Sequence, residues 1–270
     1  MFNASLHRLI SVFLLIAGAG LMSGCSFMEP KTFNFIVDMP PGFKYKAVVN
    51  YIPAPGETCT VARKDNKATV YNDKWREGYE PSIDVELKRM INDCPLIMRS
   101  VRIEVFSVYG KERGDFGTDK AFIFLRDEKN DGYKMWNKPF DATGVTLVEG
   151  QCQSLFRTMG KPRILRKLLS CKNINAQGVL ESQVPTGAYT LEQLAGKTVN
   201  LKLTWAAQDR PAGQDKWVKF PNGWKRCMGK NFEDPYAFCR GNYTDFSHFI
   251  MPDGRRCTIY PGCTEQKENE

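Results

Sequence analysis

Histidine is almost absent from this chain of 270 residues, which contains only His7 and His248. Histidine is the side chain used most often for general acid–base catalysis near neutral pH. Asp245 and Ser247 lie beside His248 in the sequence, but a nucleophile, its base and an orienting acid are usually brought together from separate elements. A G-x-S-x-G nucleophile motif is also missing. We therefore expect a protein that is not an enzyme and has no catalytic residues.

The N-terminal apolar run is too short for an ordinary membrane-spanning helix, which needs ~20 apolar residues. It covers residues 9–21, follows Arg8 and ends at the small residues Ser23 and Gly24. This order of basic, apolar and small residues is typical of a secretory signal. We therefore expect residues 1–24 to be a signal peptide.

A cysteine follows this signal, and Met22-Ser23-Gly24-Cys25 resembles the lipobox of bacterial lipoproteins. The resemblance implies that the signal is removed before Cys25, that the Cys25 thiol carries a diacylglyceryl group, and that the new amino terminus is acylated. Two or more acyl chains hold a protein stably on a membrane. Residues 25–30 would form a lipidated tether, and Ser26 implies an outer-membrane lipoprotein facing the periplasm of a Gram-negative bacterium. An ordinary signal peptide with a chance cysteine is the alternative.

Eight cysteines remain besides Cys25, and none of them are separated by the two to four residues that zinc ligands often show. With His248 as the only histidine after the signal, we expect no metal site and no cofactor. An even number of cysteines in an exported chain predicts four disulfides instead, since the periplasm is oxidising. Pairing between sequence neighbours, which we adopt although crossed pairing in the tail is an equal alternative, joins Cys59 with Cys94, Cys152 with Cys171, Cys227 with Cys239 and Cys257 with Cys263.

The chain is basic, with a formal net charge of +8 at pH 7. Arg8 is the only charged residue in the signal, so the basic surplus stays with the mature protein. Such a surplus favours acidic neighbours, which in a bacterial envelope are lipopolysaccharide phosphates, peptidoglycan carboxylates or acidic proteins. We expect no nucleic acid partner for a lipid-anchored protein.

Alternation of apolar and polar residues dominates the mature chain and predicts strands with one buried face. The clearest alternating or apolar segments are residues 43–53, 83–88, 101–110, 121–127, 145–150 and 199–205, and turn residues such as Pro40-Pro41-Gly42 and Asn130-Asp131-Gly132 separate some of them. Short strands without long helical segments between them predict antiparallel β-sandwich-like domains. The fold class expected is therefore mainly β, with a disulfide-rich C-terminal segment.

We expect three parts after the tether: a β-sandwich-like domain at 31–138, a second β-rich domain at 139–210, and a cysteine-rich basic tail at 211–270. One helix of a few turns is predicted within the second part, because Leu165, Leu168 and Leu169 fit a helical face while Gly160 and Pro162 limit its length.

The tail is rich in aromatic and basic residues and has little alternation. Trp and Arg are common at the energetic centres of protein interfaces. The candidate partner-binding residues are Trp217, Lys219, Trp224, Lys225 and Arg226. The alternative, that both tryptophans are ordinary core covering the open end of a β-domain, is at least as well supported.

Two functions fit these observations. The first is a lipid-anchored envelope protein that binds another protein in the periplasm, most specifically an immunity protein that neutralises a toxin delivered between bacteria; this is an analogy from location and architecture. The second is an envelope polysaccharide-binding protein or glycan-active enzyme that uses loop carboxylates such as Glu77 and Glu80, which lie beside Trp75 and Tyr79.

Overall fold

The computed structural model describes residues 32–61, 68–71, 76–77, 82–108, 116–229 and 234–264. The predicted signal, Cys25 and the tether lie outside these ranges. The chain divides into two units, Met1–Pro30 and Lys31–Glu270, and the description below concerns the second.

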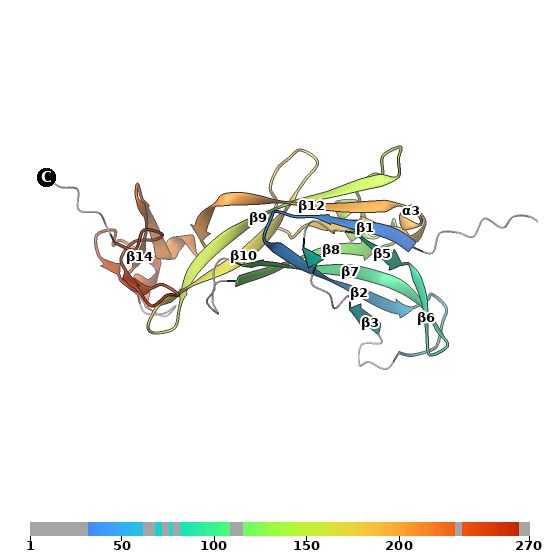
Figure 1. Cartoon of the computed structure of the whole chain (residues 1–270), viewed down its shortest axis with the longest axis horizontal. Helices are drawn as coiled ribbons and strands as arrows, with labels where there is room; N and C mark the ends of the chain where they lie inside the picture. The colour runs from blue at the N-terminus through green and yellow to red at the C-terminus, as the bar shows by residue number, and fades with distance from the viewer. Residues whose placement is uncertain are drawn as a thin grey trace, which may run out of the picture. The chain divides into compact units, whose positions relative to one another are not determined.

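Two large sheets face each other and enclose the main core (Figure 1). The first has the order β17-β16-β10-β9-β12-β1-β5. Its strands are β1 (Thr32–Asp38), β5 (Ser82–Glu86), β9 (Val145–Met159), β10 (Ile164–Ile174), β12 (Thr198–Pro211), β16 (Phe249–Ile250) and β17 (Arg256–Cys257).

The second sheet has the order β11-β8-β7-β2-β3, with β4 beside β2 and β6 beside β7. Its strands are β2 (Phe43–Pro53), β3 (Ala68–Tyr71), β4 (Arg76–Glu77), β6 (Lys88–Ile91), β7 (Cys94–Val108), β8 (Phe116–Leu125) and β11 (Thr186–Tyr189). β7 buries every second side chain along most of its length, including Val101, Ile103 and Val105, as a strand with one face on a core requires.

A mainly β fold is therefore confirmed, but the sheets are mixed rather than antiparallel. β1 pairs in parallel with β12, β12 with β9, β11 with β8, and β10 with β16. Alternation within one strand records which face is buried and carries no information on the direction of its neighbour, so the pattern could not reveal these parallel pairs.

The expected boundary at residue 138 does not separate two sandwiches. β1 and β5, from before the boundary, complete the sheet of β9, β10 and β12, while β11, from after it, extends the sheet of β2, β7 and β8. Residues on both sides of the boundary, from Phe33 to Leu203, share one core. The division at 138 is wrong because each half supplies strands that the other half's sheet needs.

The helix predicted around Leu165–Leu169 is wrong, since these residues lie in β10 and form a hairpin with β9. Leu165 and Leu169 are both buried on one face of the strand. A spacing of four residues places side chains on one face of either a helix or a strand, so it did not distinguish them. Arg163, with a φ of +55°, lies in the turn between the two strands.

The helices are short: α2 (Asp131–Trp136), α3 (Leu191–Leu194), η1 (Gln214–Lys216) and η2 (Pro235–Phe238). Asn130 caps α2, and Thr190 forms a capping box with Gln193 at α3. Within the described part of the chain, no helix has the length and apolar character needed to cross a membrane.

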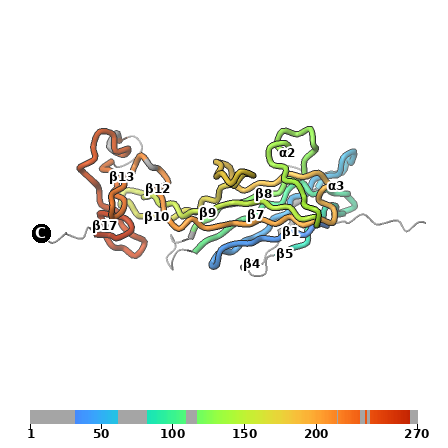
Figure 2. Tube along the Cα trace, turned by 90° about the horizontal axis from the view of Figure 1, so that it is seen from above, coloured from blue at the N-terminus to red at the C-terminus, as the bar shows by residue number. Residues whose placement is uncertain are grey.

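A third, three-stranded sheet lies in the tail, with the order β13 (Trp217–Phe220), β14 (Gly223–Cys227) and β15 (Phe246–Ser247). Figure 2 shows β13 and β17 beyond the ends of β9, β10 and β12. β9 serves both regions on one face, because Val148 and Cys152 belong to the main core while Phe156 belongs to a second core. We call the residues from 212 onward, together with the ends of β9 and β10 that they cover, the C-terminal region.

Candidate binding surfaces of the C-terminal region

The C-terminal region is built around a small aromatic core. Phe156 contacts Tyr260 and Trp217 with ring centroids 4.2 and 4.9 Å apart, and Trp217 contacts Phe249 at 5.4 Å. The side chain of Trp217 is only 4% exposed. This residue, which the sequence offered as a partner-binding candidate, therefore supports the core.

Two disulfides, Cys227–Cys239 and Cys257–Cys263, close loops of this region, and the latter lies in the second core. The main core holds Cys152–Cys171, which joins directly opposite residues of β9 and β10, and Cys59–Cys94. All four bonds join sequence neighbours, which is the pairing that the sequence analysis adopted. The tail thus obtains from β9, β10 and disulfides the stability that its own few apolar residues do not supply.

The other candidate residues, Lys219, Trp224, Lys225 and Arg226, lie on two different faces of the third sheet. Trp217 lies opposite Arg226, and Lys219 lies opposite Trp224, so these four share one face. The Lys219 ammonium lies 5.6 Å from the centroid of the Trp224 ring. Lys225 belongs to the other face, opposite Val218.

We call Val218, Phe220, Lys225 and Phe246 the aromatic–cation face. The rings of Phe220 and Phe246 meet edge to face with centroids 5.4 Å apart. The Lys225 ammonium lies 4.5 Å from the centroid of Phe220 and 5.3 Å from that of Phe246. All four side chains are half-buried. A cation held over two rings forms a surface that is both apolar and positively charged.

A pocket of about 1090 Å³ lies between the β9–β10 turn and the residues around η1 and β14. We call it the cationic pocket. Its lining residues include five cations and, among the described residues, no carboxylate; the five are Arg157, Lys161, Arg163, Lys216 and Arg226. Its apolar lining includes Met159, Trp217 and Ala237. A positively charged cavity of this size is suited to an anionic ligand.

Arg226 is the most deeply placed of these cations, with 5% of its surface exposed. Its Nε donates to the Thr158 hydroxyl at 3.1 Å and its Nη1 to the Cys227 carbonyl at 2.6 Å. The pKa of Arg226 is lowered to about 10, mainly by burial and also by the positive charge of Arg163, while the carboxylate of Asp234 opposes both effects. The guanidinium therefore carries its charge at an energetic cost.

The side chain of Arg163 reaches from the β9–β10 turn to the backbone of the tail. Its Nη2 donates to the backbone carbonyls of Met228 and Gly229, at 2.6 and 3.2 Å. Its Nε is buried and has no hydrogen-bond partner among the described residues. Lys216 shows a lowered pKa, mainly from burial, and the charges of Arg226 and Arg157 add to this effect against that of Asp215.

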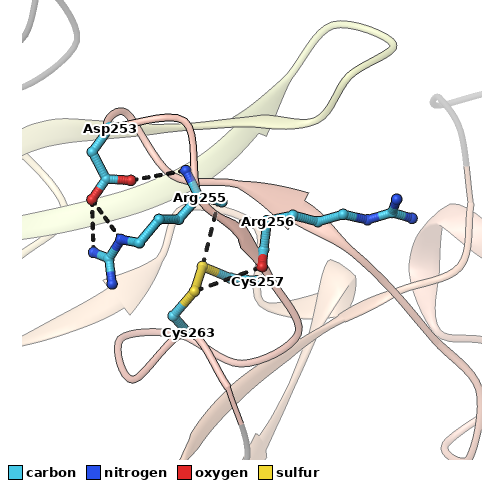
Figure 3. A network of polar contacts seen from close by, with 5 residues as sticks. All are labelled: Asp253, Arg255, Arg256, Cys257 and Cys263. Carbon is cyan, nitrogen blue, oxygen red and sulfur yellow. Dashed lines mark hydrogen bonds and ion pairs between the residues drawn. A yellow bond between two sulfur atoms is a disulfide. The ribbon is translucent and has the colours of Figure 1, made fainter.

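Arg255 and Arg256, near the tip of the tail, have different surroundings (Figure 3). The Arg255 guanidinium is paired with the Asp253 carboxylate, with Nε and Nη2 both 2.7 Å from Oδ2. The side chain of Arg256 points away from this pair and is exposed. The sulfurs of Cys257 and Cys263 lie 3.7 Å from the backbone oxygens of Arg255 and Arg256.

The residues around His248 do not form a catalytic arrangement. The Ser247 hydroxyl donates to the Cys227 carbonyl at 2.8 Å, and Asp245 accepts from Asn242. The imidazole of His248 is exposed. No group of three or more His, Cys, Asp or Glu that could hold a metal occurs in the described ranges.

Comparisons with protein-family models, with curated proteins and with solved structures find no match to this chain. Of the proposed glycan site, Glu80 lies outside the described residues, and only the backbone of Glu77 is described, in β4.

The sequence analysis identified Arg226 but missed the other cations of the pocket. Arg157, Lys161 and Arg163 occur together in "RTMGKPR", which was interpreted as the approach to a helix. A basic turn with glycine and proline is a usable signal for a hairpin end. Its meeting with Lys216 and Arg226 is a tertiary contact that no local pattern reports.

Proposed function

We propose that this protein is a lipid-anchored binding protein of the bacterial envelope that captures a second protein through the aromatic–cation face. The single observation that carries the proposal is the Phe220–Lys225–Phe246 cluster, half-buried on one face of β13–β15. Rigid rings and a cation held against them are the kind of surface that anchors protein partners.

The disulfides support this proposal, because the Cys227–Cys239 bond begins at the end of β14 and limits the freedom of the strand that bears Lys225. Ordering such a strand before binding lowers the entropy cost of association. In its most specific form the partner is an envelope-directed toxin and the protein is its immunity protein.

The experiment places a photoreactive residue at Phe220 in the full-length protein, expressed in its own host, with a matched probe at Leu147. Leu147 is an exposed apolar residue on the sandwich, 41% exposed. We expect a defined adduct from position 220 only. After purification of that partner, Phe220→Ala should lower its affinity about 10-fold or more without changing the melting temperature. Equal adducts from both positions, or unchanged affinity, would contradict the proposal.

Toxin neutralisation is tested separately. Expression of the identified partner in the periplasm of a test bacterium should stop growth. Co-expression of the wild-type protein should restore growth, and co-expression of Phe220→Ala should restore it less. The lipid anchor is tested with Cys25→Ala, which should move the protein to the soluble periplasmic fraction and abolish incorporation of labelled fatty acid. Labelling that persists in this variant would rule out Cys25 as the acylation site.

A further inference from the structure

The cationic pocket is separate from the aromatic–cation face. Arg226 and Lys225 are adjacent in β14, so their side chains point to opposite faces of the third sheet. The pocket also uses β9 and its turn, which supply Arg157, Lys161 and Arg163. It therefore calls for a ligand of its own.

Three of the five cations are arginines, whose planar guanidinium groups bind phosphate and carboxylate through paired hydrogen bonds. No carboxylate is among the described residues that line the pocket, although Asp215 and Asp234 lie close enough to oppose the lowering of the Lys216 and Arg226 pKa values. Burial is the main cause of the lowered pKa of both Arg226 and Lys216, and neighbouring positive charges lower it further, Arg163 for Arg226 and both Arg226 and Arg157 for Lys216. A multiply charged anion would relieve the repulsion among several of them at once.

The binding geometry is already formed around Arg226. Thr158 and the Cys227 carbonyl fix its guanidinium through Nε and Nη1, and the backbone carbonyls of the tail fix Arg163. A preorganised cation loses little side-chain entropy when it binds. Trp217 and Met159 add an apolar wall beside the charges, which fits an anionic group attached to a carbon skeleton better than a bare ion.

The geometry points to a site for a phosphate-bearing anion of headgroup size, held by Arg226, Arg163 and Arg157 in the cationic pocket. Phosphate is favoured over carboxylate because a phosphomonoester carries up to two charges and three oxygens, which several guanidinium groups can share. The source is either a soluble phosphate ester or a lipid headgroup.

The test titrates the full-length oxidised protein with inorganic pyrophosphate by calorimetry. Arg226→Met should lower the affinity about 10-fold or more. This variant should keep its fold, because the Cys227 carbonyl retains the Ser247 hydroxyl as a donor and Thr158 is only half-buried. Arg157→Met, which alters an exposed side chain, should lower the affinity several-fold and guards against misfolding of the first variant.

The matched control is Arg256→Met, which removes the same charge from an exposed position of the C-terminal region outside the pocket. It should bind pyrophosphate like the wild type. An equal loss in all three variants would show attraction to net charge and would overturn the site, as would no measurable binding by the wild type. Tighter binding of poly-glutamate than of pyrophosphate would also overturn the phosphate site, because it would indicate an acidic protein segment as the ligand.

Two further arms identify the source. The proteins for these arms also carry Cys25→Ala, so that acyl chains do not bind the vesicles. If the ligand is a headgroup, phosphatidylcholine vesicles that contain phosphatidic acid should recruit the protein with an intact pocket but not its Arg226→Met variant, and vesicles without phosphatidic acid should recruit neither. Pyrophosphate should displace the recruited protein. If glycerol phosphate binds and neither vesicle recruits the protein, the ligand is a soluble ester. Either result supports the phosphate site.

Discussion

The sandwich and the C-terminal region are stabilised in different ways. The main core contains 28 buried residues among those described, drawn from both sheets, whereas the second core contains seven, two of which are disulfide-bonded cysteines. Burial of apolar area dominates the stability of the first, and cross-links supplement a small core in the second. The sandwich, which also holds two disulfides, has a large core of its own, whereas the C-terminal region depends on its disulfides and on the ends of β9 and β10.

The two regions also differ in the polar groups that they bury. The C-terminal region accommodates a nearly buried cation, Arg226, at an energetic cost, and gathers four other cations around it. The main core instead buries neutral polar groups such as Tyr51, whose hydroxyl donates to the Glu86 carbonyl at 2.9 Å. Costly arrangements that stability does not require often mark functional sites.

The largest expected effect comes from removing the disulfides of the tail. Two double variants remove one disulfide each: Cys227→Ala with Cys239→Ala, and Cys257→Ala with Cys263→Ala. Each should lower the free energy of unfolding of the C-terminal region by about 2–5 kcal/mol, a loss that often prevents folding when the core is small. Limited proteolysis with mass analysis should then cut within 212–264 and leave the sandwich intact. Removing Cys152 and Cys171 serves as the control and should leave both regions folded; equal sensitivity would break the comparison.

Trp217→Ala should destabilise the C-terminal region alone, so that it unfolds before the sandwich. Truncating a large core aromatic costs about 3–5 kcal/mol, and this ring contacts both Phe156 and Phe249. Ile103→Ala is the counterpart in the main core and should lower the melting temperature of the sandwich. Unfolding followed by tryptophan fluorescence and by far-UV dichroism should give two transitions for the first variant. A single shared transition would mean that the two regions are one cooperative unit.

Alkaline pH should act on the two regions with opposite sign. Burial raises the pKa of Tyr189 to about 12, so its contribution is complete below pH 10, where the unfolded tyrosine ionises, and is lost as the pH rises to 12. Arg226 has the reverse effect, because its pKa is lowered to about 10 and the cost of its buried charge is relieved above that pH. Each effect is about 2–3 kcal/mol.

The measurement is denaturant unfolding within minutes of a jump from pH 9 to pH 11.5. We expect the sandwich to weaken and Tyr189→Phe to weaken less. The C-terminal region should lose less stability than its Arg226→Met variant, which lacks the compensating relief. Parallel losses in wild type and Arg226→Met would contradict a buried cation.

The smallest effect concerns the contact that joins the regions. Asp209 accepts from the Tyr260 hydroxyl, and its Oδ2 lies 3.2 Å from the Lys167 ammonium. Asp209→Asn keeps the shape but removes the charge, and it should cost about 1 kcal/mol because the pair is partly exposed. The matched control, Asp253→Asn, changes an exposed pair at the tip and should cost less. Differential scanning calorimetry checks the order.

Much of the fold could be predicted from the sequence, and the misses share a cause. Strand β2 was expected at its observed bounds, residues 43–53, because burial on one face leaves a clear alternation. Sheet order, parallel pairing and the union of both halves in one core depend on contacts between distant residues such as Phe35 and Val199, which leave no local pattern. For the candidate surfaces, the sequence indicated the basic aromatic tail but could not tell buried Trp217 from half-buried Trp224.

The central claim is that binding belongs to the C-terminal region while the sandwich is its scaffold. The most direct measurement is hydrogen exchange of the full-length oxidised protein with and without inorganic pyrophosphate, followed by mass spectrometry. We predict increased protection in peptides covering residues 157–163, 212–217 and 223–228, and unchanged exchange in β2, β7 and β8. Protection confined to the sandwich, or spread evenly over both regions, would contradict the claim.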